Sequence, residues 1–124
     1  MFKKTYTAFL FIILTQFCFS QEIEKPIPAF EALKNYQNTR DFTISKSQDE
    51  IYFTIQSPME DRAIIAVIKK RKNKWLQPEM TSFSGKYRDL EPFLSHDGLR
   101  LYFASNRPLA DTSSVPKDYD IWYV

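Results

Sequence analysis

Few side chains of this sequence stand at the spacings that acid–base or nucleophilic chemistry requires. The one histidine, His96, lies between Ser95 and Asp97, so the three residue types of a hydrolytic triad are adjacent in sequence. A triad needs adjacency in space, and neighbouring residues of a turn point in different directions. We therefore expect Ser95, Asp97 and Gly98 to form a structural turn, with His96 as a turn residue rather than a base.

Two groups of neighbouring carboxylates, Glu60 with Asp61 and Asp89 with Glu91, have the residue types that glycoside hydrolysis requires. Nothing in the sequence directs the members of either pair towards each other. One cysteine and one histidine exclude most metal sites, and two glycines exclude a phosphate-binding or dinucleotide-binding glycine motif. We therefore expect no catalytic residue, metal or cofactor in this chain.

The residues best placed to bind a ligand flank a long loop near the end of the chain. Asn106 and Arg107 precede the loop of residues 109–118, and Asp120 follows it. Binding residues concentrate on long loops at one rim of a rigid scaffold. Arg107 and Asp120 could recognise an anionic or polar ligand, or they could bond each other and hold the loop in place.

The first twenty residues have the features of a secretory signal peptide. Lys3 and Lys4 precede an apolar run, and the small residues Cys18 and Ser20 occupy the positions expected before a cleavage site. The run is shorter than the ~20 residues that span a bilayer. We expect cleavage, a periplasmic or secreted product, and no stable membrane insertion afterwards. Lipoprotein anchoring through Cys18 is not expected, because a bulky residue precedes it.

Cleavage changes the charge balance and the cysteine content of the chain. The 17 basic and 15 acidic residues give a net charge of +2, and residues 1–20 hold two of the lysines, so the remainder is neutral. A neutral domain has no strong field to attract nucleic acid, and the basic run from Lys69 to Lys74 is expected to be a solvated turn. Cleavage also removes the only cysteine, so packing alone must hold the domain together.

The rest of the sequence predicts short strands after a leader. Residues 21–40 contain two prolines and, around Phe30 to Tyr36, at most two turns of helix. Beyond residue 41 the apolar pattern has the period of two that is typical of strands. The predicted strands cover residues 51–55, 63–69 and, more weakly because Pro78 interrupts it, an edge strand at 75–83.

The strands recur as an internal repeat. A shift of 50 positions aligns residues 41–58 with 91–108 without a gap. The identical pairs are Ser45/Ser95, Tyr52/Tyr102, Phe53/Phe103 and Pro58/Pro108. After a longer loop in the second copy, residues 64–67 align with 121–124. A four-stranded unit that repeats at about 50 residues is typical of a β-propeller blade.

The second copy resembles a known family. Its residues 89–108, DLEPFLSHDGLRLYFASNRP, and the DYDIWYV that ends the chain resemble the TolB-like β-propeller repeat, E-P-x-F-S-P-D-G-x-x-L-Y-F-x-S-x-R followed by D-I-W. His96 replaces a proline of that pattern, and the first copy has Ser47-Gln48 in place of Asp-Gly. The resemblance implies an all-β chain of two successive four-stranded antiparallel blades, the second incomplete. The corresponding boundaries are a signal peptide at 1–20, a leader at 21–40, and blades at 41–90 and 91–124.

The resemblance also implies a function. We expect an exported, non-catalytic binding or scaffolding module of the cell envelope with a protein or glycan ligand. The alternatives are the N-terminal part of a sialidase-like or peptidase-associated propeller hydrolase, with catalytic residues outside this chain, and an envelope protein with a peptidoglycan-binding domain.

Blade number leads to a further expectation. Closed propellers contain about four to eight blades, so we expect a fragment of a longer propeller, or self-association through open blade edges. Tyr102 and Phe103 point to opposite faces of their strand and should pack against neighbouring blades.

Overall fold

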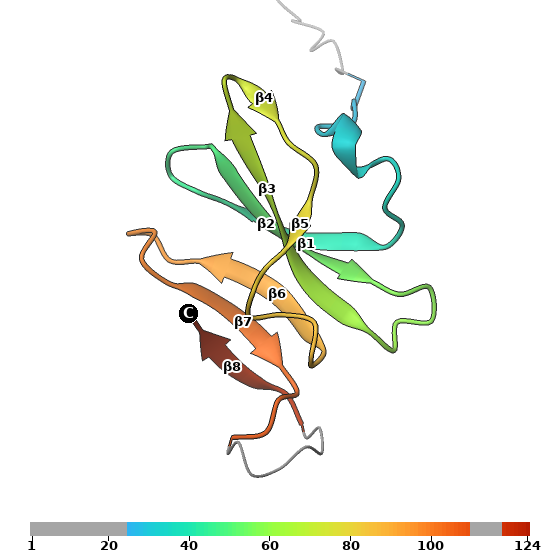
Figure 1. Ribbon diagram of the computed structural model, residues 1–124, viewed down its shortest axis with the longest axis vertical. Coiled ribbons are helices and arrows are strands. Elements are labelled where there is room, and N and C mark those ends of the chain that lie inside the picture. Colours follow the sequence, from blue (N-terminus) through green and yellow to red (C-terminus); the bar gives the residue numbers. More distant parts are fainter. Residues whose placement is uncertain (1–24, 110–117) are drawn as a thin grey trace, which may run out of the picture.

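The computed structural model describes residues 25–109 and 118–124, which form two antiparallel β-sheets and one short 3₁₀ helix, η2 (Glu31–Leu33) (Figure 1). The predicted signal peptide lies outside these residues, as does most of the long loop. Within the part that is described, no helix has the length and hydropathy to cross a membrane. The expectation of an all-β antiparallel chain is confirmed, but these residues do not form the closed ring of sheets that defines a propeller.

The first sheet has the order β1-β2-β3-β4, with β5 also paired to β3. Its strands are β1 (Thr39–Ile44), β2 (Glu50–Gln56), β3 (Ala63–Arg71), β4 (Lys74–Trp75) and β5 (Glu79–Met80). The single edge strand predicted at 75–83 is therefore wrong in extent. It is replaced by two two-residue strands on either side of Pro78, which has no N–H to donate to β3.

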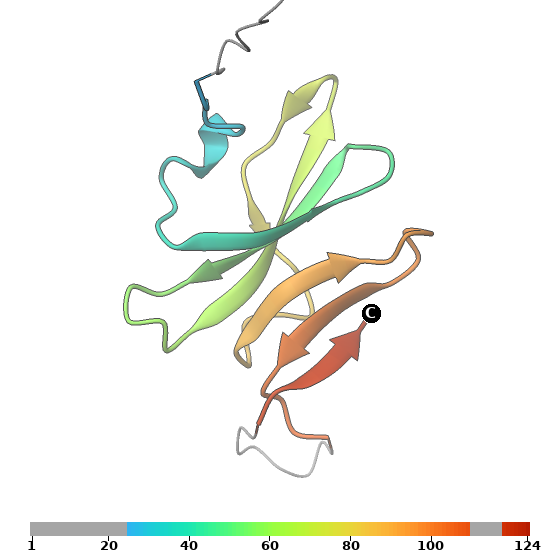
Figure 2. The same ribbon diagram turned by 180° about the vertical axis from the view of Figure 1, so that it is seen from behind.

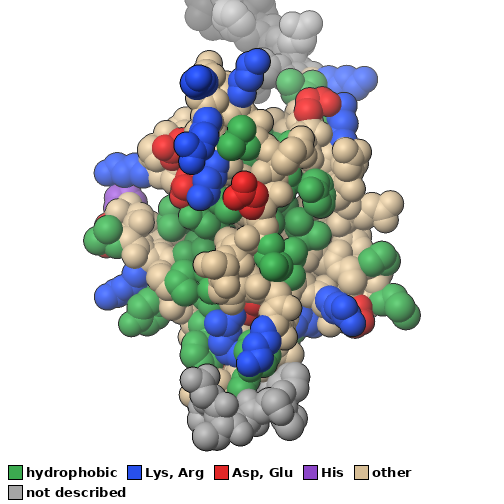
Figure 3. Space-filling model, in the orientation of Figure 1, with side chains coloured by type: hydrophobic (Ala, Val, Ile, Leu, Met, Phe, Trp, Pro, Cys, Tyr) green, Lys and Arg blue, Asp and Glu red, His purple; other side chains and the backbone are tan. Residues whose placement is uncertain are grey.

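A tight hairpin turn joins β3 to β4. Its central residues, Lys72 and Asn73, both have positive φ, at 47° and 63°. Two-residue hairpin turns of this kind match the twist of the strands that they connect. Lysine and arginine side chains gather over this hairpin, at the top of Figure 3, as predicted for a solvated basic turn.

The second sheet has the order β6-β7-β8. Its strands are β6 (Asp89–Leu94), β7 (Leu101–Ser105) and β8 (Asp120–Tyr123). β6 packs against β1, β2 and β3, so the two sheets lie side by side in both views (Figures 1 and 2).

The two units share details of backbone conformation that follow the 50-residue shift. β1 and β6 each carry a bulge, at which Asp41 and Glu91 have φ values of 52° and 55°. In the following turns, Gln48 and Gly98 also correspond and have positive φ, at 57° and 74°. Gln48 thus adopts a left-handed conformation that a glycine adopts with less strain. The first turn has the same shape as the second without the Asp-Gly pair.

The third strands are related by a different shift from the one that the sequence suggests. Backbone pairing places Phe53 opposite Ala66 in the first sheet, and Phe103 opposite Trp122 in the second. Ala66 therefore corresponds to Trp122, a shift of 56 positions, whereas the sequence alignment of 64–67 with 121–124 requires 57. A shift by one residue exchanges the two faces of a strand, so the equivalent of Ile121 is Ile65.

Two hydrophobic clusters hold the sheets. One lies on the face of the first sheet away from the second, where Phe30 and Leu33 cover Ile51, Phe53, Ala66 and Ile68. The other lies between the sheets and contains Ile65, Leu101 and Phe103, with Tyr52, Phe83, Leu94 and Trp122 packed against it. Phe103 is thus buried between the sheets, and Tyr102 lies on the opposite face beside Tyr123, with ring centroids 5.8 Å apart.

Candidate binding groove at the rim of the second sheet

A fully buried carboxylate organises one rim of the second sheet. Asp89, the first residue of β6, is 0% exposed. Its Oδ2 accepts a hydrogen bond from Ser84 Oγ at 2.7 Å, and its Oδ1 accepts from Ser105 Oγ at 2.6 Å and from Arg107 Nη2 at 2.7 Å. A buried carboxylate is tolerated only with a charged partner and hydrogen bonds, and Asp89 has both.

This network holds the Arg107 guanidinium in one position. Its Nε donates to Ser105 Oγ at 2.9 Å, and its Nη2 also donates to the carbonyl of Phe83 at 3.2 Å. The guanidinium carbon lies 4.8 Å from the ring centroid of Phe103 and 5.5 Å from that of Trp122. With three hydrogen-bond acceptors and two aromatic rings around it, and only 17% of its side chain exposed, Arg107 is pre-organised.

Arg107 lies at the wall of a groove of about 520 Å³. Lys86, Tyr87 and Trp122 line the same groove, with Lys86 Nζ 5.1 Å from the Tyr87 ring centroid. The indole Nε1 of Trp122 is buried and has no acceptor among residues 25–109 and 118–124. Neither Asp nor Glu lines the groove in that part of the chain. Its described lining therefore offers the cations of Lys86 and Arg107 and aromatic faces, which bind acceptor-rich ligands.

The three predicted rim residues have different surroundings. Arg107 lines the groove. Asn106 binds the backbone of Arg88, accepting from its N–H at 2.9 Å, and so joins the end of β7 to the start of β6. Asp120 lies opposite Ser105 in the β7–β8 pairing and is half-buried. The carboxylate that holds Arg107 is Asp89, which the sequence did not indicate as its partner.

The predicted turn residues shape the β6–β7 connection. Ser95 Oγ donates to Asp97 Oδ1 at 2.6 Å and accepts from Arg100 N–H at 2.9 Å, while Asp97 Oδ1 also accepts from Leu99 N–H at 3.0 Å. The Ser95 and Leu99 donors hold the pKa of Asp97 below its ordinary value. His96 lines a separate cavity with Phe93.

Neither group of acidic neighbours forms an acid–base pair. Asp61 accepts a 2.6 Å hydrogen bond from Ser57 Oγ in the β2–β3 turn, which lowers the pKa of Asp61. Glu60 is exposed in the same turn, with φ at 56°. Asp89 is buried in its own network, and Glu91 is exposed at the β6 bulge.

The sequence contained a signal for Asp89 that alignment of the two units makes visible. Asp89, Ser105 and Arg107 correspond to residues 39, 55 and 57 of the first unit, which are Thr, Ile and Ser. The first unit has neither a carboxylate nor a guanidinium at these positions, so the network is present in the second unit only.

Comparisons of the chain with protein families, with curated proteins and with solved structures find no match in any of the three.

Proposed function

We propose that this chain is an exported, non-catalytic binding or scaffolding module of the cell envelope, built from TolB-like β-propeller blades. In this proposal the first sheet is a complete blade and the second an incomplete one. The shared bulge, turn and strand order of the two units support this assignment, as does the packing of one sheet face on the next. Propellers are built by such repetition of one antiparallel unit.

The observation that carries the binding role is the fixed guanidinium of Arg107 at the rim groove. A charged group that is already held in place loses little conformational freedom when a ligand binds. Together with Lys86 and the aromatic rings of Tyr87 and Trp122, it suits a ligand rich in carboxylate or hydroxyl oxygens. An acidic glycan and an acidic protein segment both have this chemistry.

Calorimetric titration with oligogalacturonate and with a polyglutamate peptide tests this role. Lys86→Gln removes the exposed cation of the groove and keeps a polar side chain there. An exposed ion pair contributes up to about 1 kcal/mol, so we expect binding to weaken by up to about fivefold. Lys74→Gln, which changes an exposed lysine on β4 outside the groove, is the matched control and should bind like the unchanged protein. Equal affinities for the two variants would refute the groove assignment.

Export is tested separately, by expressing the chain in a Gram-negative host. We expect the product in the periplasm, with Gln21 as its first residue, because Ser20 ends the predicted signal peptide. A product that begins at Met1, or that stays with the membrane fraction, would contradict this part of the proposal.

A further inference from the structure

Each sheet has one face that the other sheet does not cover. The first sheet covers the second with a face that includes Tyr52 and Ile65. By strand pairing, the equivalents of these residues in the second sheet are Tyr102 and Ile121. They lie on the face directed away from the first sheet. The face of the second sheet that is directed away from the first sheet therefore has the same strand positions as the face of the first sheet that packs on the second.

That far side is apolar and exposed. We call it the distal face and define it by Phe93, Tyr102, Ile121 and Tyr123, which share one side of β6, β7 and β8. Ile121 is 73%, Phe93 64% and Tyr123 61% exposed. A contiguous apolar surface of this kind marks an interaction site.

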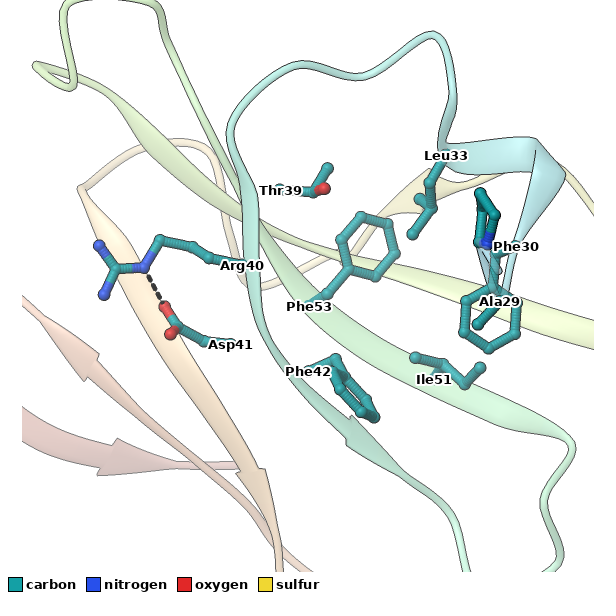
Figure 4. A pocket seen from close by; sticks show the side chains of 10 residues that line it. Ala29, Phe30, Leu33, Thr39, Arg40, Asp41, Phe42, Ile51 and Phe53 are labelled. Carbon is teal, nitrogen blue, oxygen red and sulfur yellow. Dashed lines mark hydrogen bonds and ion pairs between the residues drawn. The ribbon is translucent and has the colours of Figure 1, made fainter. Parts of the chain in front are cut away.

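The first sheet carries the complementary surface. An apolar groove of about 330 Å³ opens between η2 and the strands β1 and β2, where Phe42, Ile51 and Phe53 surround it (Figure 4). We call this surface, together with Ile44 at the end of β1, the proximal groove. The 50-residue shift matches Phe42, Ile44, Ile51 and Phe53 to Pro92, Leu94, Leu101 and Phe103. Of these, Leu94, Leu101 and Phe103 pack against Tyr52 and Ile65 within the chain.

Phe30 and Leu33 cover the proximal groove, and Phe30 must move aside for a second copy to dock there. Leu33 precedes β1 and packs on the cluster that contains Phe53. Its equivalent, Phe83, precedes β6 and packs on Phe103, with ring centroids 5.0 Å apart. The interface inside the chain thus already accommodates a side chain at the position that Leu33 occupies in the groove.

We propose that the distal face of one copy docks in the proximal groove of a second copy, head to tail, as the first sheet docks on the second within one chain. This inference rests on the repeat units of the proposed function, but not on its ligand. Head-to-tail contacts close into rings when the rotation between units permits.

The proposed contact between two copies lacks two hydrogen bonds that join the two sheets within one chain. Within the chain, Thr54 Oγ1 accepts from Glu91 N–H at 3.1 Å, and Thr43 Oγ1 accepts from Leu94 N–H at 3.2 Å. The distal face has Ala104 and Phe93 at the equivalent positions, and neither has a hydroxyl. We therefore expect association that is weaker than the internal contact and dependent on concentration.

Disulfide formation between single-cysteine variants tests the arrangement. The Thr43–Leu94 contact predicts that Phe93 of one copy lies beside Ile44 of the next. Both residues are exposed, so Phe93→Cys and Ile44→Cys should fold; both are made with Cys18→Ser. On mild oxidation we expect the mixture of the two variants to form a mixed disulfide. Met59→Cys, on an 87% exposed loop residue, replaces Ile44→Cys in the control mixture and should form none with Phe93→Cys.

Other outcomes overturn the inference. If the Phe93→Cys variant alone forms as much disulfide as the mixture does, the distal faces of two copies pack on each other about a two-fold axis. No disulfide, with a monomeric mass in sedimentation at all concentrations, would show that the distal face does not bind a second copy. Because the rim groove is not part of either surface, ligand binding that depends on Lys86 can persist in both cases, and the proposed function then stands.

A second pair of variants tests the register of the contact. Ala104→Thr adds a hydroxyl where Thr54 has one, and Ala104→Val adds the same volume without it. We expect Ala104→Thr to tighten association about two- to tenfold relative to Ala104→Val, which corresponds to one neutral hydrogen bond. Equal association constants would refute the predicted alignment of the two copies.

Discussion

Replacement of Arg107 by alanine should show that burial gives the Arg107–Asp89 pair its importance. The variant leaves the Asp89 carboxylate fully buried with only two serine hydroxyls bound to it. Removal of one partner of a buried ion pair costs about 3–5 kcal/mol. Because 17% of the Arg107 side chain is exposed and the serines remain, we expect the lower end, a loss of about 3 kcal/mol in the free energy of unfolding.

The chain supplies a matched control. Arg40 and Asp41 form an ion pair with the same 2.7 Å separation, but their side chains are 50% and 25% exposed. Exposed pairs contribute up to about 1 kcal/mol, so Arg40→Ala should lower the free energy of unfolding by no more than that. Urea unfolding followed by tryptophan fluorescence measures both variants. If Arg107→Ala is no more destabilised than Arg40→Ala, the argument from burial is wrong.

Three further predictions concern pH and turn conformation. Burial and the 2.9 Å hydrogen bond to Glu50 raise the pKa of Tyr52 to about 12. The stability that this group contributes is therefore complete below pH 10 and is lost between pH 10 and 12. In Tyr52→Phe, the free energy of unfolding should depend less on pH over that window. The lowered pKa of Asp97 contributes stability above its unfolded value near 4 that is lost in more acidic solution, and Asp97→Asn should reduce this acid sensitivity in the same assay. Gly98→Ala should destabilise the protein by about 1 kcal/mol, and Gln48→Gly should stabilise it by up to about 1 kcal/mol, because both positions have positive φ; changes of the same sign in urea unfolding would contradict this.

The strands with a clear alternation of side chains could be predicted from the sequence. β2 and β7 each place a Tyr-Phe pair on opposite faces, and their positions agree with the prediction. β3 shows why the register of the third strands was predicted wrongly. Residues 64–67 are all apolar, so alternation does not distinguish the two faces, and only backbone pairing shows which residues correspond.

The candidate site could be predicted only in part. Arg107 was found because it precedes a long loop. Its partner was missed because Asp89 lies 18 positions earlier, on a different strand, and becomes its neighbour only when β6 pairs with β7. The groove residues Lys86 and Tyr87 were missed for a similar reason, because the segment before β6 reaches the rim only in the folded chain.

The central claim is that the groove beside Arg107 binds an acceptor-rich ligand. Two-dimensional ¹H–¹⁵N NMR tests it most directly, because the two tryptophans give two indole N–H signals. We predict that titration with oligogalacturonate or polyglutamate shifts the Trp122 signal, because the Trp122 ring lines the groove, and leaves the Trp75 signal on β4 unchanged. A Trp122 signal that stays in place with both probes, or two signals that shift together, would contradict the account.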